Sequence, residues 1–387
     1  MSMDMTPLEM LEKLVSFPSV SSESNLPVID FIEEYLASHG VASHRVYDAT
    51  GDKANLYALV GPEVEGGVVL SGHTDVVPVK GQDWDSDPFT VMRKGDRLYG
   101  RGTCDMKGFD ALALAFVPEM LKAGLKRPIQ IAMSFDEEVG CLGAPSMIDE
   151  MRKELPKAAA VFVGEPSMMK VVTAHKGAYG METHVHGFEI HSSLMHQGVS
   201  ANMAAARLVN WLHKRFEENR VATPNDVDAM FEPPFTTLHV GMLNGGTAGN
   251  ITAKDCIFST DIRCPASQDP MDWYARYMEF VGEVEADMQK IRPETKITVT
   301  PRLGNPGLKP EEDGEAERLA RVLTGDNGTH VVSYGTEAGQ FQERDYSVVI
   351  CGPGSIEQAH QPNEFISVEQ FEAGAGFMRR LITQLAT

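Results

Sequence analysis

The sequence predicts an α/β protein with a mixed, mostly parallel sheet flanked by helices and an inserted α+β domain. In the first half of the chain, short apolar runs alternate with amphipathic stretches, which is the pattern of strands and helices in a parallel sheet. In the middle of the chain the order changes to β-α-β-β-α-β, and an apolar run near the C-terminus resumes the first pattern. At 387 residues the chain is long enough for two domains.

The first half supplies the elements of the expected sheet. Apolar residues spaced three and four apart predict helices over residues 8–17, 28–39 and 110–123. Short apolar runs that end at glycine or at a charged residue predict buried strands over residues 55–60, 67–71, 129–135 and 159–163.

The inserted domain is expected over residues 178–302. Its predicted strands are 180–186, 236–242, 256–263 and 296–300, and its predicted helices are 201–217 and 272–290. This order is that of a ferredoxin-like unit. A loop rich in proline and glycine follows over 301–314, and a helix over 316–323 and a strand over 347–351 then return to the first domain. Residues 1–177 and 303–387 should therefore form one domain.

Composition excludes several classes of partner. The chain holds 34 Lys and Arg against 55 Asp and Glu, a net charge of -21, so it should bind neither nucleic acid nor anionic membranes. It has no apolar stretch of membrane-spanning length, and its first ten residues do not resemble a signal peptide. Five scattered cysteines suit free thiols, and we expect a cytoplasmic location.

Histidine and acidic residues recur just after the predicted strands. The carboxyl ends of strands in an open α/β sheet line the ligand crevice, so we expect these side chains to converge although they are far apart in sequence. A further carboxylate lies in a glycine-rich stretch before a helix, Gly100-Arg-Gly-Thr-Cys-Asp-Met-Lys-Gly108. The candidate set is His73, Asp105, Glu137, Glu138, Glu165 and His360.

Unpaired carboxylates crowded into one crevice repel each other and lose hydration. Two divalent cations would remove that cost, and histidine with carboxylate ligands suits zinc, with cobalt or manganese as substitutes. Each piece also has an ordinary explanation, because a lone histidine after a strand is usually structural and a glycine-rich stretch can be a tight turn. The coincidence of several strand ends with one such stretch favours the metal site.

The same residues form a set of motifs that resembles a known family. The motifs are His73-Thr-Asp75, Gly100-Arg-Gly-x-x-Asp105-Met-Lys-Gly108, Asp136-Glu137-Glu138, Gly164-Glu165-Pro166 and His360-x-Pro-Asn-Glu364. In this order they resemble the family of acetylornithine deacetylase, succinyl-diaminopimelate desuccinylase and carboxypeptidase G2, which are co-catalytic zinc hydrolases. The resemblance covers essentially the whole chain.

The resemblance implies a role for each residue. Asp105 would bridge two zinc ions, with His73 and Glu165 completing one site and Glu138 and His360 the other. Asp75 would hydrogen-bond the imidazole of His73 and select its tautomer. Glu137 would act as the general base, taking a proton from the attacking water and returning it to the departing amine.

The inserted domain carries further residues that match the family. His191, in Gly187-Phe-Glu-Ile-His191-Ser-Ser193, would reach the active site of a neighbouring subunit and contact the oxyanion, which implies a homodimer. Met195-His196 stands where many relatives have a proline. Lys176, Asn250 and Arg263 match positions that contact the carboxylate of the substrate. His191 could instead be an exposed loop residue, and Arg263 an ordinary strand-end ion pair.

The expected reaction is hydrolysis of the amide bond of an N-acyl amino acid, with N-acetylornithine as the first choice. The segment Tyr334-Gly-Thr336-Glu337-Ala-Gly339 resembles the acetylornithine branch, so Thr336 and Glu337 are candidate substrate-binding residues. An acidic residue suits the second amine of ornithine, although Glu337 could instead pair with Arg344.

Several alternatives stay open. Within the family they are a succinyl-diaminopimelate desuccinylase, an aminoacylase or a dipeptidase. A non-catalytic binding protein and a metal-storage module are less favoured, because all five expected ligands and the additional Glu137 are present.

Overall fold

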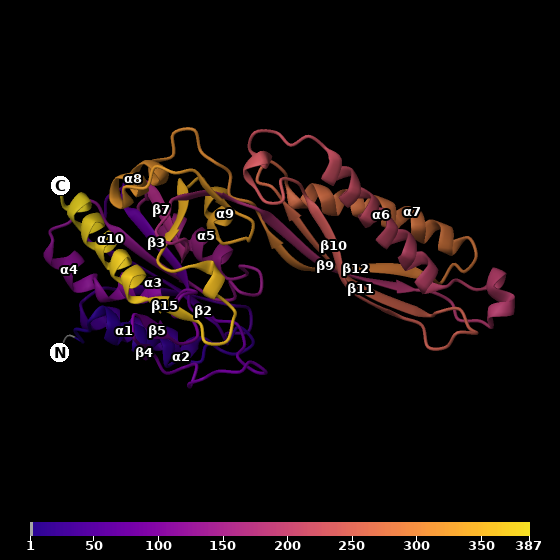
Figure 1. Ribbon diagram of the computed structural model, residues 1–387, viewed down its shortest axis with the longest axis horizontal. Coiled ribbons are helices and arrows are strands. Elements are labelled where there is room, and N and C mark those ends of the chain that lie inside the picture. Colours follow the sequence, from indigo (N-terminus) through magenta and orange to yellow (C-terminus); the bar gives the residue numbers. More distant parts are fainter. Residues whose placement is uncertain (1–2) are drawn as a thin grey trace. The chain divides into compact units, whose positions relative to one another are not determined.

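The computed structural model describes residues 3–387, which divide into two compact units (Figure 1). Unit 1 comprises residues up to Ala174 together with Pro310–His330 and Thr336–Thr387. Unit 2 comprises His175–Lys309 and also Val331–Gly335. The insert thus begins and ends several residues away from the expected limits of 178 and 302, and the return of 331–335 to unit 2 was not expected. Within the described residues, no helix is long and apolar enough to cross a membrane.

Unit 1 is built on an eight-stranded sheet whose order is β1-β2-β6-β3-β7-β14-β8-β13. The four neighbours β6, β3, β7 and β14 are parallel and buried along their whole length, as expected for strands covered on both faces. The strands are β1 (Ser43–Tyr47), β2 (Ala54–Val60), β3 (Val68–His73), β6 (Ile129–Ser134), β7 (Ala160–Pro166), β8 (Val172–His175), β13 (His330–Val332) and β14 (Val348–Gly352).

Helices flank this sheet. One group, α3, α8 and α10, packs together against β3, β7 and β14, and a second, α5 and α9, packs against β6 and β14. The helices of unit 1 are α1 (Pro7–Val15), α2 (Leu26–Ser38), α3 (Lys107–Ala115), α4 (Val117–Lys122), α5 (Ala144–Glu154), α8 (Glu315–Thr324), α9 (Ala338–Gln342) and α10 (Val368–Ala386), with a 3-10 turn η3 (Ile356–Gln358).

The helix predictions need correction where one helix is broken and where helices were missed, namely α5, α9 and α10. The single helix expected over 110–123 is broken into α3 and α4 at Phe116, because Pro118 has no N–H to donate to the carbonyl four residues earlier. Helix α10 was missed, although Phe371, Met378 and Leu385 recur every seven residues and are buried.

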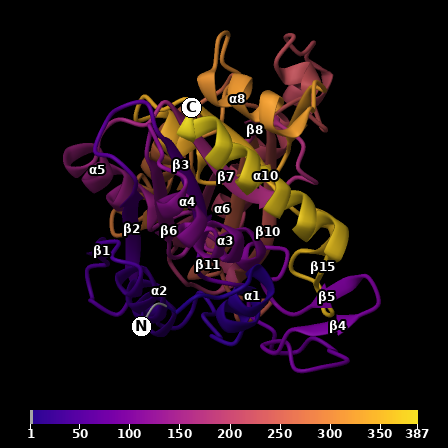
Figure 2. The same ribbon diagram turned by 90° about the vertical axis from the view of Figure 1, so that its left-hand side faces the viewer.

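A small sheet of order β15-β5-β4 lies next to α10 (Figure 2). Its strands are β4 (Met92–Lys94), β5 (Arg97–Tyr99) and β15 (Phe365–Ser367). Phe365 pairs with Tyr99, and the N–H of Gly100 donates to the carbonyl of Glu364 over 2.9 Å. This pairing brings together two loops that are more than 250 residues apart in sequence, the one that follows β5 and the one that precedes β15.

Unit 2 has the predicted order β-α-β-β-α-β and forms an antiparallel sheet of order β10-β11-β9-β12. Helices α6 and α7 lie side by side on one face of this sheet (Figure 1). The elements are β9 (Gly177–His186), α6 (Ala201–Val221), β10 (Thr237–Gly245), β11 (Asp255–Cys264), α7 (Pro270–Gln289) and β12 (Lys296–Asn305), with 3-10 turns η1 (Ser192–Gln197) and η2 (Asp228–Met230).

Strand β12 runs five residues further than the predicted strand. It continues through Pro301 because that residue lies at a bulge on an edge strand, where no ladder hydrogen bond is lost. Along β9, Met181, Thr183 and Val185 are buried, and the residues that alternate with them are only half-buried. The sheet of unit 2 therefore has one face in the core and one polar face.

Candidate metal centre

Three parallel strands of unit 1 end at the same edge of the sheet, and their ends carry four of the predicted residues. His73 is the last residue of β3 and is in register with Ser134, the last residue of β6. Glu137 and Glu138 follow β6 directly, and Glu165 lies near the end of β7. The carboxyl ends of parallel strands meet at one edge, which is why residues from three separate strand ends, spread over positions 73 to 165, converge.

Asp105 and His360 come from the two loops that β5 and β15 hold together. Gly102 has a φ of +82°, and a Cβ there would lie 2.9 Å from Val76, so the turn before Asp105 requires glycine. His360 adopts a φ of +63° in the loop before β15. The sheet edge and the paired loops thus supply all five predicted metal ligands to one place.

The two oxygens of Asp105 face different histidines. Oδ1 lies 3.2 Å from His73 Nε2, and Oδ2 lies 3.3 Å from His360 Nε2. His73 Nε2 is also 3.7 Å from Glu165 Oε1, and His360 Nε2 is 2.8 Å from Glu138 Oε2. The side chains therefore form two ligand sets, His73 with Glu165 and His360 with Glu138, which share Asp105.

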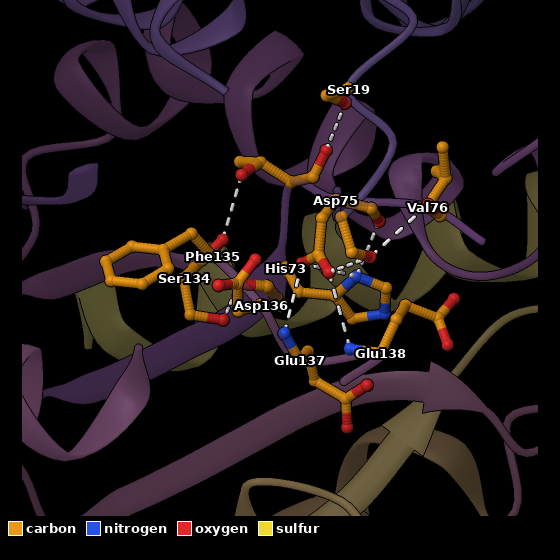
Figure 3. Close-up of polar contacts among 12 residues, drawn as sticks. Ser19, His73, Asp75, Val76, Ser134, Phe135, Asp136, Glu137 and Glu138 are labelled. Atoms are coloured by element: carbon orange, nitrogen blue, oxygen red, sulfur yellow. Dashed lines mark hydrogen bonds and ion pairs between the residues drawn. The ribbon is translucent and has the colours of Figure 1, made fainter. Parts of the chain in front are cut away.

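Asp75 supports this edge in a different way from that expected (Figure 3). The Nδ1 atom of His73 bonds the backbone carbonyl of Asp75 over 2.9 Å, and the carboxylate is 3.6 Å away. That carboxylate instead accepts hydrogen bonds from the backbone N–H groups of Glu137 and Glu138, at 3.1 and 3.3 Å, and from the hydroxyl of Ser21. The side chain of Asp75 holds the Glu137–Glu138 turn, and its main chain orients the histidine.

Three acidic groups of the centre, those of Glu137, Glu138 and Glu165, have raised pKa values, whereas the pKa of Asp105, which burial would raise, is lowered by the two histidines. Burial and the neighbouring carboxylates of Glu138 and Asp105 raise the pKa of Glu137 to about 8. Burial, with the charge of Asp105, raises the pKa of Glu138 to about 7 and that of Glu165 well above its usual value.

The pKa values of the two histidines are raised, which favours their positively charged forms. Hydrogen bonds to Asp105 and Glu138 raise the pKa of His360 to about 10. Burial works against a charged His73, yet Asp105 and the other carboxylates raise its pKa well above the usual value. Raised pKa values at both histidines and at three of the acids mean that the site favours added positive charge, which divalent cations would supply.

The donor set fits such ions. Oε1 of Glu165 is buried and has no hydrogen-bond partner among the described residues, which leaves its lone pairs available. His73, Asp105 and Glu138 present atoms within 4.8 Å of one another, and so do His73, Glu137 and Glu165. Nitrogen and carboxylate oxygen donors in this number suit two ions of the zinc class.

The comparisons with known proteins agree with this geometry. The model of peptidase family M20/M25/M40 matches residues 69–384, which is most of the chain. This chain belongs to the M20/M25/M40 family. It is accordingly an enzyme, a metal-dependent hydrolase of amide bonds.

Relatives in this family match over nearly the whole chain. An acetylornithine deacetylase from Myxococcus xanthus is 34% identical, with 93% of this chain and 92% of the relative covered. One from Pasteurella multocida is 31% identical, with 98% of each covered.

Solved structures share the fold. An M20 family metallo-carboxypeptidase from Sulfolobus solfataricus superposes with a TM-score of 0.78 at 17% identity, with 99% of each chain covered. A tripeptidase from Staphylococcus aureus gives 0.73 at 20% identity, with 98% of each covered. A dinuclear metal-binding M20 peptidase from Bacillus subtilis gives 0.66 at 13% identity, covering 98% of this chain and 97% of that one.

The other predicted residues of unit 1 lie deeper in this M20 enzyme than expected. Glu337 is buried, and its carboxylate accepts hydrogen bonds from the hydroxyls of Ser71 and Ser134, on β3 and β6. The alternative pairing with Arg344 is wrong, since Arg344 bonds Asp149. Thr336 is also buried, and its hydroxyl accepts from the N–H of Ala338 at the start of α9. These contacts give Glu337 a supporting position behind the strand ends.

In unit 2, the predicted substrate-binding residues differ in exposure. Lys176 is buried, and its ammonium donates to the carbonyls of Pro233 and Phe235, so it holds a loop of its own unit. Arg263 donates to Asp261 two residues away, which is the strand-end ion pair considered as its alternative. His191 and Asn250 are exposed, and the imidazole of His191 bonds the hydroxyl of Ser193 over 2.8 Å.

A buried ion pair that was not predicted stabilises the Asp105 loop of the M20 centre. Glu364 accepts hydrogen bonds from the backbone N–H groups of Cys104 and Asp105, at 3.0 and 3.1 Å, and pairs with Arg101 at 2.6 Å. Arg101 also donates to Gln82, which in turn donates to the carbonyl of His360. The sequence offered one signal for this, because Glu364 closes the His360-x-Pro-Asn-Glu motif.

Substituting Glu364→Gln should weaken both the fold and metal binding. Arg101 would be left as a buried charge without its counter-ion, which should lower the free energy of unfolding by about 3 kcal/mol. The less constrained Asp105 loop should lower metal affinity about 10- to 100-fold. Urea unfolding and competition with a zinc-binding dye measure the two effects, with the exposed Glu312→Gln as control. Unchanged metal affinity in Glu364→Gln would show that the pair does not position Asp105.

Proposed function

We propose that this M20 enzyme removes the acyl group from an N-acyl amino acid, with N-acetylornithine as the preferred substrate, and that it uses two zinc ions. The observation that supports this most is the position of Glu137. Its carboxylate lies within 4.8 Å of the donor atoms of His73 and Glu165 and is additional to the five residues that form the two ligand sets. A binding or storage protein would have no need of this sixth group.

Two zinc ions held by His73, Glu165, Glu138 and His360 around Asp105 would polarise the amide carbonyl and lower the pKa of the attacking water. Glu137 then accepts a proton from that water on a carboxylate oxygen, and hydroxide attacks the carbonyl carbon. When the C–N bond breaks, the same carboxyl returns the proton to the departing nitrogen, which gives acetic acid and the free amine. The proton of the acid then passes to that amine, so the products are acetate and ornithine with a protonated α-amine.

The chain itself holds Glu137 for this work. The N–H of Glu137 donates to Asp75, and the thiol of Cys141 lies 3.2 Å from its Oε1. A pKa raised to about 8 makes Glu137 a stronger base than an ordinary carboxylate when it is ionised. Bound cations would favour the ionised carboxylate of Glu137 and so lower its pKa.

The choice of substrate is supported by the relatives and by charge. Acetylornithine deacetylases are 31 to 34% identical over nearly the whole chain. A net charge of -21 favours the approach of a substrate whose side chain is cationic. The structural neighbours include a carboxypeptidase and a tripeptidase, so peptide hydrolysis is the natural competitor.

In this proposal unit 1 is the catalytic domain and unit 2 the lid and dimerisation domain of a cytoplasmic homodimer, with His191 as the oxyanion donor. The edge strand β10 of unit 2 supports a dimer, since Met242 and Leu243 on it are 63% and 53% exposed. Exposed apolar side chains beside unpaired strand groups favour pairing with another strand. All five cysteines are buried and form no disulfide, which suits a reducing compartment.

Substituting Glu137→Gln should abolish turnover and leave the metal ions bound. Loss of general base catalysis should lower kcat by about 100- to 10,000-fold, because Gln cannot accept the proton. Metal content by elemental analysis should equal that of the wild type, as should that of the exposed control Glu312→Gln. A Glu137→Gln enzyme that keeps most of its kcat would eliminate Glu137 as the base.

A panel of substrates tests the preferred substrate directly. N-acetylornithine, N-acetylmethionine, N-succinyl-diaminopimelate and alanyl dipeptides are compared by kcat/KM with the zinc-loaded enzyme. We expect N-acetylornithine to lead by about tenfold or more, because only it offers a single cationic side chain to an acidic protein. A higher kcat/KM for the succinyl compound or for a dipeptide would transfer the assignment to that branch of the family.

Mixing two inactive variants tests the shared site. His191→Ala should lower kcat by about two to three orders of magnitude, as loss of an oxyanion donor does. When it is mixed with Glu137→Gln under conditions of subunit exchange, about a quarter of the wild-type activity should return, since half of the dimers hold one site with both residues intact. No recovery despite demonstrated exchange would mean that His191 does not act across subunits.

A further inference from the structure

A second group of metal-binding side chains lies on the polar face of unit 2. His184 Nε2 is 2.8 Å from Asp255 Oδ1, and His186 Nδ1 is 3.5 Å from the same oxygen. The two imidazole rings lie against each other with centroids 3.6 Å apart. One donor atom of each residue can be chosen so that all three lie within 4.8 Å of one another.

The strand geometry explains why these donors converge. His184 and His186 are two residues apart on β9, so both project from the face opposite to Thr183 and Val185, which are buried under α6 and α7. Asp255 opens β11 and is directly opposite His186 in the antiparallel register. The three side chains are partly exposed, so an ion can reach them from solvent.

The surroundings of His186 favour its neutral form. Burial and the adjacent charges of His184 and Lys296 lower the pKa of His186, which favours the neutral ring that a metal ion needs. Asp255 supplies one negative charge. Lys296 is opposite His186 on β12. It favours loss of the proton from His186, and it also repels an approaching metal ion.

We propose that His184, His186 and Asp255 bind one divalent cation of the zinc, nickel or copper class. Two imidazole nitrogens and one carboxylate oxygen are donors that these borderline ions prefer to calcium or magnesium. In its neutral form, each imidazole can bind the metal through one ring nitrogen and keep its single hydrogen on the other. The hydrogen bond between His184 and Asp255 is then replaced by one bond from each residue to the metal. Water completes the coordination.

The position of the site gives it a consequence for the proposed reaction. Beyond His186 and before Asp255, the two segments of the chain continue as a two-stranded ribbon. In it the N–H of Gly187 donates to the carbonyl of Lys254, and the N–H of Thr252 donates to the carbonyl of Ile190. The far end of this ribbon is the bridge between His191 and Ile251, next to Asn250. An ion bonded to β9 and β11 would therefore fasten the base of the segment that carries His191 and Asn250. This consequence, unlike the site itself, rests on the proposed function.

The site is tested by counting zinc ions per chain in the full-length protein after equilibrium dialysis. His184→Gln/His186→Gln should bind one equivalent fewer than the wild type, and Asp255→Asn should weaken that equivalent about tenfold. His213→Gln, which removes an exposed histidine on α6, is the matched control and should bind as the wild type does. Lys296→Gln should tighten the same equivalent, since it removes the repelling charge. Equal zinc content in the wild type and the double variant would overturn the proposal.

Variants of the two centres separate this proposal from the proposed function. His73→Ala/His360→Ala removes ligands of unit 1 and should leave the equivalent bound by unit 2 unchanged. In that variant, zinc should slow amide hydrogen exchange over residues 187–191 and 250–254, and the effect should vanish when His184→Gln/His186→Gln is added. Zinc that binds without changing this exchange would show that the ion does not fasten the ribbon. Neither measurement depends on catalytic activity, so failure of the proposed function would leave both results interpretable.

Discussion

The centre of unit 1 depends on the carboxylate of Asp105, whose two oxygens face two different histidines. Around it lie three further carboxylates that burial would otherwise force to take up protons. The arrangement is therefore stable only with added positive charge, whether as protons on His73 and His360 or as metal ions. Crowded buried carboxylates raise the free energy of the folded chain when no cation is present, and for the same reason they favour the binding of a pair of cations.

Much of unit 1 serves to hold Asp105 and its partners in place. The pairing of β5 with β15 joins the Asp105 and His360 loops, and the carboxylate of Glu364 receives the N–H of Asp105 itself. On the other side, Asp75 receives the N–H groups of Glu137 and Glu138. Asp105, Glu137 and Glu138 are thus oriented by buried acceptors bonded to their backbone N–H groups, which fixes the main chain and leaves their side chains free.

Unit 2 is organised by a simpler constraint, a four-stranded sheet with helices on one face only. The polar face that this leaves brings His184, His186 and Asp255 together, and the exposed edge β10 brings Met242 and Leu243 to the surface. The first feature follows from alternation along β9, because every second residue of a one-sided sheet faces away from the core. Met242 and Leu243 are consecutive, and both are exposed because the second half of β10 is exposed on both faces.

The sequence by itself determined the α/β class and the ferredoxin-like order of the insert, because strand and helix periodicity are local properties. It also singled out His73, Asp105, Glu138, Glu165 and His360 through their motifs, and the structure brings these five side chains together. Only the tertiary structure decided which atoms the predicted side chains bond. It directs the Asp75 carboxylate to two N–H groups, buries Glu337 against Ser71 and Ser134, and turns Lys176 toward carbonyls of its own unit. Those outcomes depend on contacts between residues tens to hundreds of positions apart, and hydrogen-bond partners at that separation leave no periodic trace in the sequence.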